Sequence, residues 1–218
     1  RTKIAYHLAL TYGAEGYYDE KNFIVKYTKN KENIFLKTRQ RFDNEVITQK
    51  NLPCVKHHQD EYGGHFPAWA AVELFTFGML SSLYSVMQPQ DRKVIASQYN
   101  TDAYHLQSWI LALVEVRNIC AHYGRIYNMP LKQSPNLYSE NQQYAGNKVF
   151  PLLLTIKRMI TDFSTWNTFT TSLFALVDEY SEAKIEYMGF PNDLRNTHHN
   201  TKDGIDSEWK RLLERKMK

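Results

Sequence analysis

Residues 108–128, which read SWILALVEVRNICAHYGRIYN, decide the fold of this chain. Their apolar residues recur at intervals of three and four, the spacing that gathers side chains on one face of a helix. Pro130 follows closely, and proline cannot continue a helix. The pattern predicts one long helix over residues 102–127.

Helical patterns continue on both sides of this stretch. The sequence has only 9 Gly and 7 Pro and no run that alternates as a strand does, so we expect an all-α fold. Further helices are predicted over residues 1–13, 31–62 (one or two exposed helices with a break near Pro53), 68–87, 90–99, 148–164 and 166–186.

One domain is predicted over residues 1–193. Residues 194–218 are expected to form a mobile segment and a basic amphipathic helix over residues 206–217. The chain opens inside an apparent helix and without Met, so we expect that an N-terminal part of the domain is missing from it.

Residues 69–87 approach the length of a membrane span. Glu73, three serines and the lack of flanking basic clusters favour a helix buried inside protein, so no membrane contact is expected. Two cysteines do not make a disulfide framework, and we expect a cytoplasmic protein.

Three polar residues of the central stretch could carry chemistry. Arg117, Asn118 and His122 place a permanent cation, an amide and a titratable imidazole within about one and a half helical turns. Arg117 falls on the apolar stripe of the predicted helix, where an unpaired charge is costly to bury. Either Arg117 pairs with Glu115 or another acid and His122 is a satisfied polar residue, or the cluster holds a phosphate and transfers protons beside it.

Four separated segments carry a resemblance to a known family. In order, they are RTKIAYHLALTYG (1–13), FPAWAAVELFTFGMLSSLY (66–84), residues 108–128 and EYMGFPND (186–193). Together they resemble the Abi-like proteins of the AbiD/AbiF type, which are bacterial abortive-infection factors of the HEPN superfamily. The resemblance implies a HEPN-like helical bundle with inserted exposed helices. Family members usually carry a further N-terminal helical region before the first of these segments.

The resemblance also implies an activity. Arg117, Asn118 and His122 match the catalytic Arg-polar-x3-His motif of HEPN ribonucleases, and Arg125 and Asn128 match neighbouring positions that we expect to bind substrate. Histidine titrates near neutral pH and can act as acid or base, while arginine matches phosphate oxygens with a planar fork. We expect an antiviral, metal-independent endoribonuclease toxin that needs no cofactor and leaves a 2′,3′-cyclic phosphate. The alternative is a non-catalytic RNA-binding or toxin-like interaction module.

A single motif offers one strong proton-transfer group, His122, whereas cleavage needs an acid and a base. HEPN enzymes typically bring two motifs together, so the resemblance implies a symmetric homodimer. We expect the two copies of His122 to lie roughly within 10 Å of each other. An antitoxin or a regulatory RNA is a further partner that this kind of protein suggests.

Basic residues gather between Lys21 and Lys56, a segment that contains nine Lys and Arg residues and three acidic residues. They form either a solvated helix face or a surface that meets RNA phosphates. In the second case, Lys37, Arg39 and Arg41 are expected to contact substrate.

Several potential metal ligands also lie close together in the sequence. Cys54, His57, His58 and His65 fall within twelve residues. Their spacing does not match a standard zinc site, and no second ligand pair follows, so no metal is expected.

Overall fold

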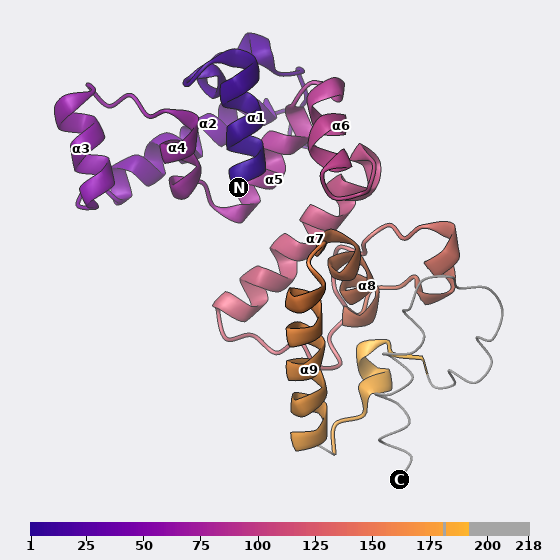
Figure 1. The fold of residues 1–218 in the computed structure, drawn as a ribbon. Coiled ribbons are helices and arrows are strands. Elements are labelled where there is room, and N and C mark those ends of the chain that lie inside the picture. The colour runs from indigo at the N-terminus through magenta and orange to yellow at the C-terminus, as the bar shows by residue number, and fades with distance from the viewer. Residues whose placement is uncertain (181, 192–218) are drawn as a thin grey trace. The chain divides into compact units, whose positions relative to one another are not determined.

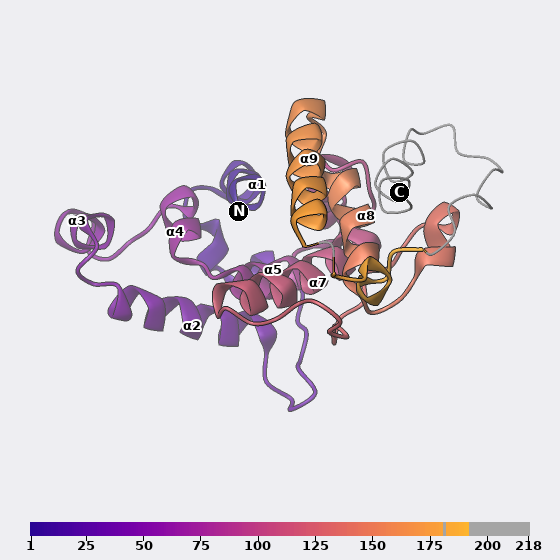
Figure 2. The same cartoon turned by 90° about the horizontal axis from the view of Figure 1, so that it is seen from below.

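The computed structural model describes residues 1–180 and 182–191, and these form an all-α fold (Figures 1 and 2). The predicted segment and basic helix within residues 194–218 lie outside the described residues. With η for a 3-10 helix, the elements are α1 (Thr2–Tyr12), η1 (Gly16–Tyr18), η2 (Glu20–Asn22), α2 (Ile34–Thr48), α3 (Pro53–Glu61), α4 (Ala68–Leu74), α5 (Phe77–Val86), α6 (Pro89–Ser97), α7 (Ala103–Ala121), η3 (Ser139–Tyr144), α8 (Val149–Met159), α9 (Phe163–Glu179) and η4 (Ile185–Met188).

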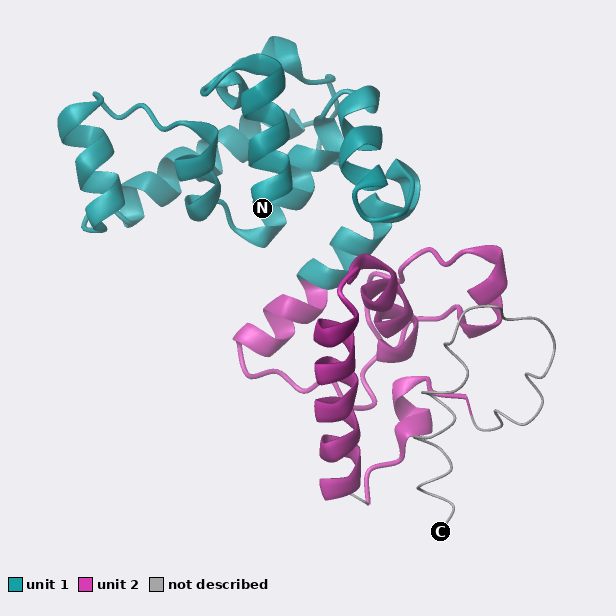
Figure 3. Ribbon diagram, viewed as in Figure 1, with its two compact units in different colours: residues 1–114 teal, residues 115–218 magenta. Residues whose placement is uncertain are grey.

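The chain divides into two compact units, residues 1–114 (unit 1) and residues 115–218 (unit 2) (Figure 3). The boundary falls inside α7, whose last two turns belong to unit 2. None of the described helices is both long enough and apolar enough to span a membrane.

Aromatic side chains form the centre of unit 1. Phe42 of α2 is fully buried, and its ring stacks on Phe75 with 4.9 Å between the centroids. Tyr17 and Phe66 meet Phe42 edge-on, with centroids 5.9 and 6.0 Å away. Such aromatic pairs stabilise a core beyond the area that they bury. Around them α2 packs on α5, and α1 packs on α4.

A buried carboxylate joins α1 to α6 in unit 1. Asp91 is only 5% exposed, and its two oxygens lie 2.8 Å from His7 Nε2 and 2.7 Å from the Tyr12 hydroxyl, which donates to it. Because a buried charge is costly unless it is paired and hydrogen-bonded, these contacts fix the position of α6 against α1.

Two helix boundaries match the sequence prediction closely. α1 ends at Tyr12 and is capped by Gly13, whose φ of 85° suits glycine and whose amide donates to the Ala9 carbonyl. The region 31–62 forms two helices, and the second begins at Pro53, where a missing amide proton costs nothing.

The predicted single helix over residues 68–87 is wrong, because the chain forms two helices there. Phe75 and Thr76 adopt extended backbone conformations between α4 and α5. The Thr76 hydroxyl accepts a hydrogen bond from the Met79 amide at 3.2 Å and so begins α5. The break lets the Phe75 ring reach the aromatic core, where it is 4% exposed.

Unit 2 has a core of its own. Phe150, Leu153 and Leu154 of α8 pack with Trp166 of α9 and with Phe190. The predicted helices over 148–164 and 166–186 are displaced, since α8 ends at Met159 and α9 begins at Phe163. The Asp162 carboxylate explains the new start, because it accepts a hydrogen bond from the Thr165 amide at 2.6 Å.

Candidate functional site

The predicted motif lies at the C-terminal end of α7. Arg117 and Asn118 occupy the last turns of the helix, and His122 is the first residue after it, with its amide bonded to the Asn118 carbonyl at 3.1 Å. All three side chains are exposed. The expectation that Arg117 lies on a buried apolar stripe is therefore wrong, because the apolar face of α7 is buried only up to Ala112.

Arg117 is held by a neutral partner. Its Nη1 donates to Asn118 Oδ1 at 3.1 Å, so the amide orients the guanidinium without cancelling its charge. The structure does not contain the predicted alternative, an ion pair between Arg117 and Glu115. The Glu115 carboxylate instead accepts hydrogen bonds from the amides of Lys132 and Gln133 at 2.8 and 2.7 Å.

A tight turn stops α7 directly after the motif. Gly124 donates to the Ile119 carbonyl at 2.7 Å and Tyr123 donates to Cys120 at 3.1 Å, which is the bonding pattern of a Schellman motif. Tyr123 has a φ of 54°, in the left-handed region, and its side chain is 98% exposed. A Cβ on Gly124 would lie 2.8 Å from Ile119 Cγ2, so only glycine fits there without a shift. The turn overturns the prediction that the helix runs to residue 127.

The residues after the turn are tied into unit 2. Ile126 packs against the core of unit 2, and the Tyr127 hydroxyl accepts a hydrogen bond from the Lys184 amide at 3.0 Å. Asn128 has a φ of 55°, which asparagine tolerates, and its Oδ1 accepts from Lys148 Nζ at 3.3 Å. Arg125 is exposed between these anchors.

The resulting surface is cationic and open to ligand. The side chains of His122 and Arg125 make no hydrogen bond or ion pair within residues 1–180 and 182–191, and no carboxylate pairs with Arg117 there. Arginines that lack an acidic partner can take phosphate oxygens, and an unengaged imidazole can exchange protons. The arrangement can bind a phosphodiester and move a proton beside it.

The basic residues predicted to bind substrate take different positions. Arg39 is engaged within unit 1, because its Nη1 donates to the Tyr18 carbonyl at 3.0 Å and its guanidinium lies 3.9 Å from the Tyr18 ring centroid. Lys37 and Arg41 instead line a cavity together with Ser81 and Gln107. The sequence did not point to Ser81 or Gln107 as site residues. The one signal for Ser81 was the spacing of Ser81, Ser82 and Ser85 on one side of α5.

Two of the histidines that were considered as metal ligands have partners within unit 1. His58 Nδ1 lies 3.0 Å from the His65 carbonyl oxygen, and His65 Nδ1 lies 2.9 Å from Glu15 Oε2. Among the residues that the structure describes, no group of three or more His, Cys, Asp and Glu side chains is placed to hold a metal ion.

Comparison with models of protein families matches residues 1–128 to the family described as Abi-like protein. The match covers all of unit 1 and ends at Asn128, after the motif and its turn. No curated protein and no solved structure matches the chain.

Proposed function

The chain belongs to the Abi-like protein family, and from this premise we propose that it is a metal-independent endoribonuclease that acts in abortive infection. Family membership supports the abortive-infection role. The ribonuclease activity rests on the resemblance of Arg117, Asn118 and His122 to the HEPN motif and on the chemistry of the surface that they form.

One observation carries the proposal: the motif presents an imidazole and two guanidinium groups to solvent, and no carboxylate of residues 1–180 or 182–191 neutralises them. Arg117 bonds only to the neutral amide of Asn118, and Arg125 and His122 have no side-chain partner in the described parts of the chain. An oriented but uncompensated guanidinium suits a phosphate that arrives with its own charge.

The proposed reaction needs two proton transfers. The 2′-oxygen of the ribose attacks the adjacent phosphorus and loses its proton to one imidazole, while the 5′-oxygen leaves and takes a proton from another. The products are a 2′,3′-cyclic phosphate and a 5′-hydroxyl. His122 supplies one of these groups in each chain, so a second copy of the protein supplies the other. Arg117 stabilises the charge that builds on the phosphorane oxygens.

The test is cleavage of mixed RNA by the full chain in EDTA. We expect the wild-type protein to leave RNA ends that carry a cyclic phosphate. A phosphatase should remove this phosphate only after acid has opened the ring. His122→Ala and Arg117→Ala should each lower the cleavage rate by about 100-fold or more, the usual effect of losing an acid–base group or a charge-stabilising donor.

His57→Ala is the matched control, because His57 is also an exposed histidine but lies on α3 outside the motif. It should cleave RNA as the wild-type protein does. Cleavage that survives both motif substitutions, or that requires a divalent metal, would rule out the proposed mechanism.

A second candidate function is an RNA-binding module that does not cut. The observation that favours it is the exposure of the three motif side chains, since catalytic groups are usually shielded from bulk water. In this case RNA co-purifies with intact ends, and its affinity falls steeply with salt. Binding without new RNA ends, at protein concentrations well above the dissociation constant, would favour the module over the enzyme.

A further inference from the structure

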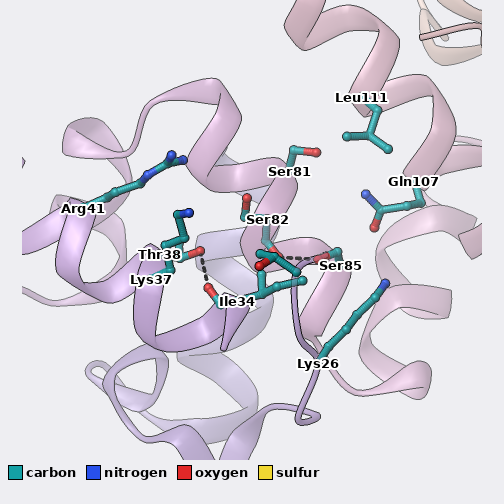
Figure 4. Close-up of a pocket in the computed structure, with 11 residues that line it drawn as sticks. Lys26, Ile34, Lys37, Thr38, Arg41, Ser81, Ser82, Ser85, Gln107 and Leu111 are labelled. Carbon is teal, nitrogen blue, oxygen red and sulfur yellow. Dashed lines mark hydrogen bonds between the residues drawn. The ribbon is translucent and has the colours of Figure 1, made fainter. Parts of the chain in front are cut away.

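Unit 1 contains a cavity of about 410 Å³ (Figure 4), within the size range of small-molecule sites. Its walls come from α2, α5, the unit 1 part of α7 and the loop that precedes α2. Every lining residue belongs to unit 1, and none comes from residues 117–128. The cavity therefore belongs to a different part of the chain from the proposed nuclease motif.

The charged residues of the cavity are all basic. Lys26, Lys37 and Arg41 line it, and no aspartate or glutamate does. Lys37 donates a hydrogen bond to Glu32, which is not a lining residue. That bond is the main reason why the pKa of Glu32 lies below its usual value, and the charge of Arg41 adds to the effect.

Two of these three cations lack an acidic partner. The side chains of Lys26 and Arg41 make no hydrogen bond or ion pair within the part of the chain that the structure describes. An anionic ligand is the natural complement of this surface.

Two of the residues that line the cavity carry buried polar atoms without partners in the described chain. Ser81 is 3% exposed, and neither its Oγ nor the buried Oε1 of Gln107 has a hydrogen-bond partner in the described chain. The contrast with their neighbours is direct, because Thr38 Oγ1 donates to Ile34 and Ser85 Oγ donates to Ser82, each at 2.7 Å (dashed in Figure 4).

Buried polar groups in native proteins are almost always hydrogen-bonded, so two such atoms beside one cavity point to a ligand that bonds them. Both residues line the same cavity. The amide of Gln107 is directed toward α5, which carries the serines (Figure 4).

The apolar part of the lining argues for a small ligand. Ile34 and Leu111 supply aliphatic contacts, and no aromatic residue lines the cavity. Proteins that hold an extended single strand of nucleic acid usually stack its bases on aromatic rings along a groove. A lining of cations, hydroxyls, one amide and two aliphatic side chains suits a ligand that brings phosphate, hydroxyls and a flat ring together.

We propose that this cavity binds a nucleoside phosphate. The cations Lys26, Lys37 and Arg41 hold its phosphate oxygens at the rim. Ser81 and Gln107 form hydrogen bonds with its sugar or base, and Ile34 and Leu111 cover the faces of the base.

Isothermal titration calorimetry of the full chain with AMP and ATP tests the proposal. At least one of them should bind with one ligand per chain, and more tightly than adenosine or inorganic phosphate alone, because both halves of the ligand contribute. Lys26→Gln and Arg41→Gln should each weaken binding by roughly tenfold, as expected for loss of a charge-assisted hydrogen bond.

Lys29→Gln is the matched control, since Lys29 is an exposed lysine of the same loop that does not line the cavity. It should leave the affinity unchanged. If neither nucleotide binds, or if Lys29→Gln weakens binding as much as Lys26→Gln does, the proposal is wrong.

Ser81→Ala separates a ligand contact from a structural role. A buried hydroxyl without a partner does not stabilise the fold, so the melting temperature of the unliganded protein should stay the same or rise. Nucleotide affinity should nevertheless fall several-fold. A variant that melts lower and binds nucleotide normally would contradict the assignment.

A short single-stranded RNA provides the remaining comparison, with the His122→Ala chain used so that the RNA stays intact. Binding of this RNA that depends on Lys26 and Arg41 and that AMP and ATP do not displace would overturn the proposal in favour of a strand-binding surface. Displacement by either nucleotide supports it.

Discussion

Tyr123 is the residue on which the geometry of the motif depends most directly. It follows His122 and takes the left-handed conformation that ends α7, a position that glycine fills in most helices. The side chain is 98% exposed, so its own packing does not compensate for the backbone conformation. Strained residues of this kind concentrate at functional sites, and here the strain adjoins the proposed catalytic imidazole.

The substitution Tyr123→Gly should therefore stabilise the protein. Left-handed backbone costs a non-glycine residue about 1–2 kcal/mol, part of which the greater freedom of glycine in the unfolded chain offsets, leaving a gain of about 1 kcal/mol. Urea denaturation of the full chain measures it. Tyr123→Ala is the control, because it removes the same ring but keeps the strain, and it should change stability little. A Gly variant no more stable than the Ala variant would contradict this account.

At the same scale, the sequence suggested a chemistry for the motif but did not predict its setting. The types and spacing of Arg117, Asn118 and His122 were enough to suggest phosphate binding and proton transfer. Their exposure was not predictable, because the apolar spacing of α7 continues past the residues that are buried. The pair of Ser81 and Gln107 was beyond prediction, since residues on two separate helices come to line one cavity only after the chain has folded.

Among the elements, α4 and α5 show how one buried side chain overrides a helical pattern. Residues 68–87 have helical spacing throughout, and no proline or glycine pair marks a break. The chain nevertheless leaves the helix at Phe75, whose ring stacks on Phe42. A local pattern cannot reveal this break, because the interaction that favours it joins residues far apart in the sequence. Gly13 and Pro53 set boundaries through their own backbones, and those boundaries were predicted.

The hydroxyl of Thr76 should carry a measurable part of the stability of α5. Thr76→Ala removes the hydrogen bond to the Met79 amide, and the loss of such an N-cap costs about 1 kcal/mol. Thr48→Ala serves as control, because Thr48 is also an exposed threonine of unit 1 but its hydroxyl donates within α2 to Asn44. Urea midpoints should fall for Thr76→Ala and hardly move for Thr48→Ala. Equal midpoints would show that the cap is not what begins α5.

Across the whole molecule, titration of buried and half-buried tyrosines predicts a loss of stability in alkali. Burial is the main cause that raises their pKa above the ordinary value of 10.0, and for Tyr12, which also bonds Asp91, it brings the pKa to about 12. The residues with raised pKa are Tyr12, Tyr17, Tyr18, Tyr84 and Tyr99, all in unit 1.

The sign of the effect follows from which state keeps the proton. Above pH 10 the unfolded chain loses these protons and the folded chain retains them, so the free energy of unfolding falls as the pH rises toward the folded pKa values. Urea midpoints between pH 8 and 11 should decline less steeply for Tyr84→Phe, which removes a fully buried hydroxyl, than for the wild-type protein. Tyr104→Phe, at a side chain that is 68% exposed, should keep the wild-type slope. Equal slopes for all three proteins would contradict the prediction.

The family match includes the motif but not all of the residues that hold the motif segment in place. The match ends at Asn128, yet the motif segment is anchored by groups that follow it. Lys184 donates to the Tyr127 hydroxyl, and the Glu115 carboxylate holds the amides of Lys132 and Gln133. The residues of the motif thus lie in the matched part of the chain, while part of what positions them lies in the rest of unit 2.

The proposed homodimer makes a prediction that a monomeric enzyme cannot satisfy. If one active site uses His122 from two copies, a mixed dimer of wild-type and His122→Ala chains holds only one of the two imidazoles that cleavage needs. Adding His122→Ala chains to a fixed amount of wild-type protein should therefore lower the rate of RNA cleavage per wild-type chain. The wild-type rate per chain should also fall on dilution below the dissociation constant of the dimer. A rate per wild-type chain that the added variant leaves unchanged, although exchange of chains is shown by co-purification of differently tagged copies, would mean that each chain cleaves alone.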